Sequence, residues 1–182
     1  MWIISEADYH ERKFLPLPLP ISLPFKIMKK ITLLTVADSW HHFEKPIAEY
    51  EKRLQKELNI VLLKPHKSGE TETIRKLDTQ DVIEELEKYS DSFVVFCDVL
   101  GKTLGDTKAM SAWLSQKMQQ HKSVVFVIGG AYGLDMTLMK PRVDYVLSFT
   151  DWTLPHWLAV LMLIEQLYRT TNLLAGGKYH HE

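Results

Sequence analysis

Only one cysteine, Cys97, occurs among the 182 residues of this sequence. A single cysteine excludes an internal disulfide framework, and a reducing cytosol is then the simplest setting, so we expect a cytoplasmic protein. An excess of charge of one sign is also missing, because 22 Lys and Arg residues oppose 23 Asp and Glu residues, for a formal net charge of −1. Any nucleic-acid partner must therefore be bound by a local basic patch. Cys97 lies in an apolar run and is predicted to be a small core residue.

The long apolar run that a membrane span needs is missing as well. Residues 14–27 are apolar but contain four prolines, which remove backbone donors and fix φ, and the apolar segment Trp157–Ile164 has only eight residues. The N-terminus also lacks the basic start and the small-residue cleavage site of a signal peptide. We expect no membrane partner, and we treat residues 1–27 as a Pro-rich extension outside a single domain at residues 28–182.

From Met28 onward, apolar strand-like runs alternate with amphipathic helical patterns. Strands are predicted at Ile31–Val36, Ile60–Leu63, Phe93–Cys97, Val124–Ile128 and Tyr145–Phe149, and helices at Pro46–Leu58, Asp81–Tyr89 and Thr107–Gln120, the last with Asp106 as N-cap. The helical segment Trp157–Ile164 is apolar all round, so it is expected to be buried against another surface. Strands that alternate with helices predict an α/β fold, with a mostly parallel sheet flanked by helices.

Three strand exits are rich in small or polar residues, and ligands of parallel sheets bind at the carboxyl ends of the strands. The exits are residues 97–102, 129–134 and 150–156. The pair Gly129-Gly130 lets the backbone pass close to a ligand and adopt positive φ without steric cost. By spacing alone, a tight structural turn is as good an interpretation as a cofactor loop, because the dinucleotide fingerprint is incomplete and no phosphate loop occurs.

The order of these motifs resembles the RlmH family. The motifs are Cys97-Asp98-x-x-Gly101-Lys102, Phe126-Val-Ile-Gly-Gly-x-x-Gly-Leu134, Leu147-Ser-Phe-x-x-x-Thr-Leu-Pro-His156, Ile164-Glu-Gln-Leu-Tyr-Arg169 and the terminal Tyr179-His180. The RlmH family comprises small SPOUT-superfamily enzymes that methylate N3 of a pseudouridine in bacterial large-subunit ribosomal RNA. The resemblance covers roughly residues 28–182.

The resemblance implies a SPOUT-type sheet with a C-terminal trefoil knot, an exception to unknotted topology. It also implies a homodimer and S-adenosyl-L-methionine as cofactor, with large-subunit ribosomal RNA, in the context of the ribosome, as substrate, and no metal. By motif, the cofactor contacts fall on Cys97, Gly129, Gly130, Phe149, Thr150, Asp151, Trp152, Thr153 and Leu154. The family usually has Leu where this chain has Cys97, a difference that a backbone contact tolerates.

The residues expected to handle the target base are His156, Arg169, Tyr179 and His180, with Lys178 and His181 as phosphate or base contacts. Each has a simpler interpretation. His156 could be a half-buried histidine after a first-turn proline, Arg169 could pair with Glu165 one turn earlier, and the tail could be a solvated end. The family commonly has Arg or Lys where this chain has His181, and a neutral imidazole there would weaken phosphate attraction at pH 7.

Other function classes stay open at this point. The chain could methylate a different RNA, or bind S-adenosyl-L-methionine and RNA as a dimer without turnover. It could also be a nucleotide-binding α/β module or a scaffold dimer. His41 and His42 are assigned to a loop before the first helix, since neighbouring histidines point apart and no third ligand is suggested.

Overall fold

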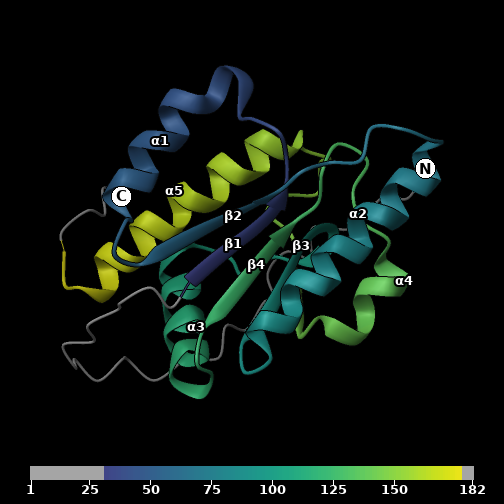
Figure 1. Cartoon of the computed structure of the whole chain (residues 1–182). Helices are drawn as coiled ribbons and strands as arrows, with labels where there is room; N and C mark the ends of the chain where they lie inside the picture. Colours follow the sequence, from purple (N-terminus) through teal and green to yellow (C-terminus); the bar gives the residue numbers. More distant parts are fainter. Residues whose placement is uncertain (1–30, 178–182) are drawn as a thin grey trace, which may run out of the picture.

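The computed structural model describes residues 31–177. Its centre is a parallel sheet of five strands in the order β2-β1-β4-β3-β5 (Figure 1). The strands are β1 (Ile31–Val36), β2 (Leu58–Leu63), β3 (Phe93–Lys102), β4 (Val124–Ile128) and β5 (Tyr145–Leu147). All five strands are parallel, and β4 lies between β1 and β3. The loops that follow strands distant in sequence therefore lie side by side at the carboxyl end of the sheet.

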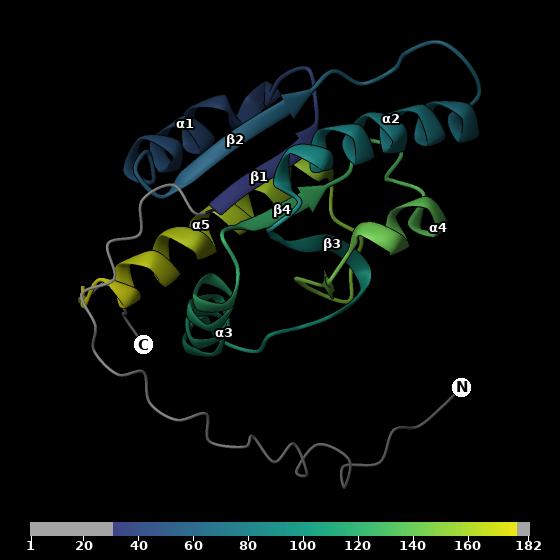
Figure 2. The ribbon, with the colours of Figure 1, turned by 60° about the horizontal axis from the view of Figure 1, so that its bottom comes forward.

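Helices cover both faces of the sheet. The helices are α1 (Glu44–Arg53), α2 (Thr71–Leu86), α3 (Thr107–Gln120), α4 (Met136–Met139) and α5 (His156–Leu174), with 3-10 turns η2 (His41–Phe43), η3 (Glu87–Tyr89) and η4 (Lys140–Arg142). One apolar cluster joins the sheet to α1, α3 and α5, and a second joins it to α2 and α4 (Figure 2). The predicted α/β class, a parallel sheet flanked by helices, is confirmed.

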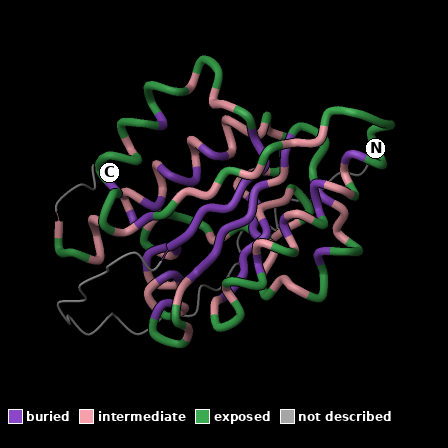
Figure 3. The backbone as a smooth tube through the Cα atoms, in the orientation of Figure 1, coloured by how far each residue is buried: buried purple, intermediate pink, exposed green. Residues whose placement is uncertain are grey.

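The central strands form the most buried part of the chain (Figure 3). All residues of β1 and β4 are buried, as expected for parallel strands covered on both faces, whose sequences are continuous apolar runs. β2 lies at an edge, and of its six residues only Leu58 is buried, while Asn59 and Leu62 are exposed. This core holds the carboxyl ends of the strands in fixed positions.

Several element bounds differ from those predicted. The first helix ends at Arg53, because Leu58 begins β2 and is buried there. The second helix begins at Thr71 rather than Asp81. The added residues 71–80 are mostly polar, and Ile74 is the one apolar residue buried among them, so the amphipathic pattern there is weak. By contrast, α3 has the predicted bounds, and its predicted N-cap Asp106 accepts a hydrogen bond from the Ala109 N–H at 2.7 Å.

β3 continues past its predicted end and meets β5 a second time. After Cys97 the pairing shifts register, and Lys102 pairs with Leu147. The Lys102 carbonyl accepts the Ser148 N–H at 3.1 Å. A Cβ atom on Gly101 would lie 2.6 Å from the Leu147 carbonyl carbon, so only glycine fits at this crossing. The crossing brings the β3 and β5 exits together, while the trefoil knot expected of the chain stays a prediction.

Helix α5 is partly covered within the subunit. It lies against α1 and α3, and its residues Val160, Leu163 and Ile164 are fully buried. The expectation that the segment Trp157–Ile164 is buried is therefore confirmed for one face only, because its other five residues are half-buried in the single subunit. Across residues 31–177, no helix combines the length and the hydrophobicity needed to cross a bilayer.

Candidate functional site

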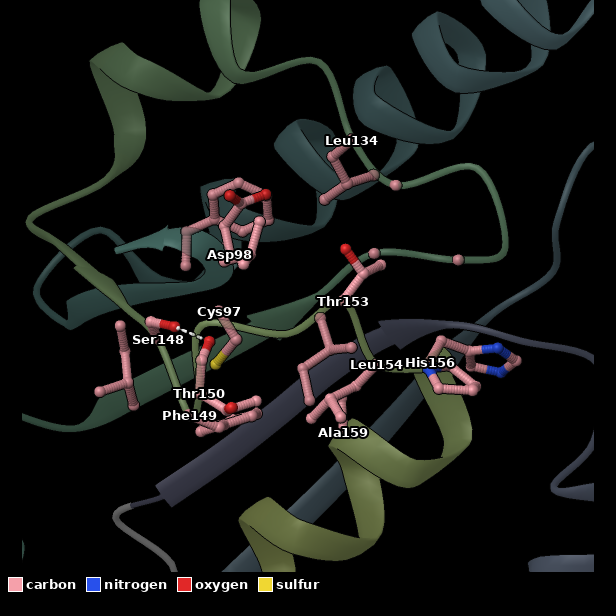
Figure 4. Close-up of a pocket in the computed structure, with 18 of the residues that line it drawn as sticks. Cys97, Asp98, Leu134, Ser148, Phe149, Thr150, Thr153, Leu154, His156 and Ala159 are labelled. Carbon is pink, nitrogen blue, oxygen red and sulfur yellow. Dashed lines mark hydrogen bonds between the residues drawn. The ribbon is translucent and has the colours of Figure 1, made fainter. Parts of the chain in front are cut away.

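A cavity of about 600 Å³ opens at the carboxyl ends of β3, β4 and β5. The three strand exits and the start of α5 form its wall (Figure 4). Of the residues predicted to contact a ligand, those that line it are Cys97, Gly129, Gly130, Phe149, Thr150, Trp152, Thr153, Leu154 and His156. The folded chain thus brings together loops that are up to 59 residues apart in sequence, between Cys97 and His156.

Cys97 is half-buried and lines the cavity from the β3 exit. Burial raises the pKa of its thiol, and the negative charge of neighbouring Asp98 raises it further. The thiol therefore stays protonated at neutral pH. This state fits the predicted role of a small apolar residue and not that of a nucleophile.

Three glycines shape the β4 exit by different means. A Cβ on Gly129 would lie 2.9 Å from the Gly133 backbone, and one on Gly130 would lie 3.1 Å from the Val36 carbonyl oxygen. The positive φ expected at Gly129-Gly130 is instead found at Gly133, with φ 69°. The Gly133 N–H donates to the Gly130 carbonyl at 3.0 Å, which closes a tight turn. The interpretation as a tight structural turn is therefore confirmed, and because this turn also lines the cavity, the interpretation as a cofactor loop stays a prediction.

The β5 exit is held by a short polar network. Buried Ser148 donates its hydroxyl hydrogen to the Thr150 carbonyl at 2.7 Å (Figure 4), and the Thr150 hydroxyl accepts the Trp152 N–H at 3.3 Å. These bonds fold the loop so that Phe149 and Thr150 line the cavity. Asp151, also predicted as a contact, is exposed and does not line it. Trp152 stands at the rim with 79% of its surface exposed.

His156 begins α5 at the cavity wall. Its Nε2 atom is buried and has no hydrogen-bond partner among the described residues. Burial lowers the pKa of His156, and the positive charge of His41 lowers it further, so the imidazole is neutral at pH 7. A stacked contact between Phe43 and Trp157, with ring centroids 4.0 Å apart, holds the η2 turn against the start of α5.

Pro155 precedes α5 as its N-cap residue and is not the first helical residue. It has no side-chain donor or acceptor to cap the helix. The proline was predicted at the first helical position, and it lies one residue earlier. The histidine after it lies at the cavity wall, which keeps the predicted contact with a substrate open.

Arg169 lies away from the cavity in the same subunit. It forms an ion pair with Glu165 one turn earlier, as in the simpler interpretation of the sequence. Along α5, Arg169 is about 20 Å from His156 at 1.5 Å per residue. Tyr179 and His180, with Lys178 and His181, lie outside the described residues, so their predicted roles stay predictions.

Sequence reasoning did not single out Asp98, Leu134, Ser148 or Ala159, all of which line the cavity. Asp98 and Leu134 are part of the motifs given above, and a usable signal for Asp98 was that it directly follows the predicted strand Phe93–Cys97. Ala159 gave no signal of its own, because it lines the cavity only through its place on the first turn of α5. No group of three His, Cys, Asp or Glu side chains among residues 31–177 could hold a metal ion.

Comparison with known proteins was made for sequence and for structure. A family model described as "Predicted SPOUT methyltransferase" matches residues 28–180. A Syntrophotalea carbinolica protein named "Ribosomal RNA large subunit methyltransferase H" is 34% identical over 157 residues, 84% of this chain and 99% of that protein. A protein of the same name from Acidiphilium cryptum is 37% identical over 134 residues, 74% of this chain and 82% of that protein.

Solved structures show the same fold at low sequence identity. A candidate RNA methyltransferase from Bacillus anthracis aligns with a TM-score of 0.52 and 17% identity, over 83% of this chain and 99% of that one. A methylase family protein from Haemophilus influenzae aligns with a TM-score of 0.51 and 14% identity, over 85% of this chain and 71% of that one. At these identities the alignments speak for the fold alone.

Proposed function

This chain belongs to the SPOUT methyltransferase family, and we propose on that basis that it is an S-adenosyl-L-methionine-dependent ribosomal RNA methyltransferase. Its substrate would be N3 of a pseudouridine in large-subunit ribosomal RNA, within the ribosome. The relatives named for large-subunit ribosomal RNA methylation support this substrate, because they align over most of the chain. The alternatives are methylation of another RNA and binding of cofactor and RNA without turnover.

The observation that carries the proposal is the convergence of the three strand exits on one cavity. Its volume of about 600 Å³ lies within the range of small-molecule sites, roughly 300–1,000 Å³. Apolar side chains such as Phe149, Leu154 and Leu134 suit a purine ring, and the half-buried Gly129, which has no side chain, lines the cavity with its backbone. The described residues therefore fit a nucleoside cofactor.

When bound, S-adenosyl-L-methionine supplies a methyl group that its sulfonium already activates. The chain's own residues have to hold donor and acceptor in line and exclude water. We assign the holding of the cofactor to the loop at Phe149–Leu154 and to the turn at Gly129–Gly133. Ser148 acts through its bond to the Thr150 carbonyl, which fixes the shape of that loop.

The target N3–H must lose its proton in the reaction. His156 suits this task, because it lines the cavity and its imidazole is neutral at pH 7. A charged imidazole could not accept a proton. His180 remains a second candidate base, on the family likeness alone.

We propose a homodimer in which the tail of one subunit reaches the cavity of the other. Arg169 lies about 20 Å along α5 from His156, too far to share the cavity of its own subunit. Two exposed large apolar residues, Val99 and Trp152, line the cavity, and two more, Leu100 and Tyr132, are next in sequence to lining residues. Such an exposed apolar group of residues suits coverage by another macromolecule.

The reaction is tested by incubating the full chain with labelled S-adenosyl-L-methionine and ribosomes from a bacterial strain lacking the RlmH-type enzyme. We expect label in large-subunit RNA at N3 of one pseudouridine, located by mass spectrometry of nuclease fragments. The matched control is the same ribosome with uridine at the target position, which should take up no label. Label in a different RNA would favour the first alternative.

Cofactor binding without any labelled RNA would favour the non-catalytic alternative. If isothermal titration shows binding of neither S-adenosyl-L-methionine nor its demethylated product, the proposal fails as a whole. The dimer is tested separately by sedimentation equilibrium, where a mass of twice the 21.2 kDa chain is expected. A monomer that still turns over would refute the shared site while leaving the reaction intact.

A further inference from the structure

Asp98 is the one carboxylate among the described residues that line the cavity. The other polar groups of the wall are hydroxyls, the protonated thiol of Cys97, two indoles and the neutral imidazole of His156. No Lys or Arg of residues 31–177 lines it. The wall therefore carries a single full charge, and that charge is negative.

The position of this carboxylate is fixed by the backbone. Asp98 follows Cys97 where β3 leaves its first pairing with β5, and its Oδ1 accepts the Leu100 N–H at 2.9 Å. Figure 4 shows Asp98 on the same side of the cavity as Leu134, apart from the turn at Ser148–Thr150. Asp98 is half-buried and forms no ion pair within the described part of the chain.

An uncompensated carboxylate in a largely apolar cavity acts over several ångströms, because the surroundings screen it less than water does. Its influence on a neighbouring group is visible at the Cys97 thiol. After burial, the charge of Asp98 is the second cause of the raised thiol pKa. A positive charge placed in the same cavity experiences the opposite effect and is stabilised.

A sulfonium ion carries a positive charge but no N–H or O–H, so it is recognised chiefly through electrostatic attraction. In the methyl transfer, the S–CH₃ bond breaks with its electron pair left on sulfur, the N–CH₃ bond forms, and the N3 proton passes to a base. The sulfur thereby becomes a neutral thioether. The charged donor and the neutral product differ by this one charge at nearly the same shape.

We propose that Asp98 is a specificity-determining residue, which makes the cavity prefer the sulfonium donor to its thioether product and so favours product release. This inference rests on the proposed function and deepens it. Asp98 is a binding residue in this role and takes no part in proton transfer. The cavity prefers the donor because the positive charge of its sulfonium offsets the negative charge of Asp98, and the thioether of the product has no such charge.

The test compares three ligands by isothermal titration with the full chain at pH 7.5. The ligands are S-adenosyl-L-methionine, the neutral-sulfur product S-adenosylhomocysteine, and sinefungin, whose amine carries a positive charge in place of the sulfonium. The variant is Asp98→Asn, whose amide oxygen can still accept the Leu100 N–H. The control is Asp91→Asn, an exposed site before the start of β3, which changes the net charge equally.

We expect Asp98→Asn to weaken binding of the two cationic ligands about tenfold and that of S-adenosylhomocysteine less than about twofold. Asp91→Asn should leave all three affinities within about twofold of the unaltered chain, because it lies outside the cavity. Equal weakening of all three ligands by Asp98→Asn would mean that Asp98 contacts a shared group, and it would overturn the inference. Unchanged affinities would overturn it as well.

The outcomes separate this inference from the function it rests on. If the unaltered chain binds none of the three ligands, the proposed function itself fails, and the inference fails with it. If the unaltered chain binds them but Asp98→Asn does not alter their relative affinities, only the role of Asp98 is refuted. A circular dichroism spectrum of the variant identical to that of the unaltered chain confirms that it is folded.

Discussion

At the scale of single residues, two titratable groups of the cavity wall are held in their neutral form. Burial raises the pKa of the Cys97 thiol and lowers the pKa of the His156 imidazole. Both shifts have the same largest cause, because leaving water disfavours the charged form of any group, whichever sign that charge has. Asp98 is then the only wall group with a full charge at neutral pH. Desolvation and one carboxylate together set the electrostatics of the site.

The pKa of His156 can be measured by an NMR titration of its ring. Because its value lies below the ordinary 6.5 of the unfolded chain, the folded protein binds fewer protons between the two values. The contribution of His156 to the unfolding free energy is therefore fully present above pH 6.5 and is lost as the pH falls through the lowered pKa. His41→Ala should raise the pKa of His156 only part of the way to 6.5, since burial is the larger cause.

The matched control for that titration is His42→Ala. His42 is exposed next to His41, but it is not among the causes of the shift at His156. The control should therefore leave the pKa of His156 unchanged. A His41→Ala protein whose His156 titrates as in the unaltered chain would contradict the electrostatic contact between the η2 turn and α5.

At the scale of elements, the second meeting of β3 with β5 decides whether a cavity exists. Between Cys97 and Lys102 the register of β3 against β5 shifts, so residues 98–101 form a bulged part of β3 before Lys102 pairs with Leu147. Asp98 and Val99 line the cavity from this bulged part, and the turn that Ser148 closes lines it from the β5 exit. A regular strand would keep these residues paired with β5, with side chains alternating between the two covered faces. The irregular pairing thus creates the wall.

Gly101→Ala tests this crossing. The added Cβ would lie 2.6–2.7 Å from backbone atoms of Val146, Leu147 and Ser148, and no side-chain rotation relieves contacts with backbone. We expect a loss of about 2–3 kcal/mol in unfolding free energy, measured by urea denaturation at fixed protein concentration. Weaker cofactor binding should accompany this loss, because the crossing positions the β3 and β5 exits.

Gly133→Ala is the comparison variant for that experiment. A Cβ there meets nothing within 4 Å, but the φ of 69° is unfavourable for alanine, so a loss of about 1–2 kcal/mol is expected. Equal stability of Gly101→Ala and the unaltered chain would show that the two strand exits do not approach as closely as described.

At the scale of the whole molecule, the five-stranded sheet is the scaffold, and the cavity lies at the carboxyl ends of its strands. Two apolar clusters, one on each face, fix the strands relative to one another. The loops at the carboxyl edge are then held by short contacts of their own, such as the Gly130–Gly133 turn and the bond from Ser148 to Thr150. All of these contacts lie within residues 31–177, and we predict that residues 1–27 are not part of the fold.

Removal of residues 1–27 tests that division. The family match begins at residue 28, and among the described residues 31–177 the apolar clusters already include Ile31. We expect the chain of residues 28–182 to keep its thermal midpoint within about 2 °C, a change of well under 1 kcal/mol, and to bind S-adenosyl-L-methionine as the full chain does. A midpoint lower by many degrees, measured beside the full chain at equal concentration, would place the extension in the fold.

The sequence by itself determined the fold class, most strands and the three exits, because these depend on local periodicity and on the residue types that follow each strand. β1, β4 and α3 kept their predicted bounds, since the hydrophobic pattern is strong there. The sequence also showed the resemblance to a known family, because the order of the motifs can be read without coordinates. The first half of α2 was missed because its polar residues show little periodicity.

Only the tertiary structure decided which predicted residues meet. It placed His156 at the cavity wall and Arg169 about 20 Å away on the same helix. The motifs had predicted the same role, contact with the target base, for both residues. The tertiary structure also assigned the positive φ to Gly133, and it left Asp98 as the single charge of the wall. These outcomes depend on contacts between β3, β4, β5 and α5, and such long-range packing leaves no periodic signal in a single sequence.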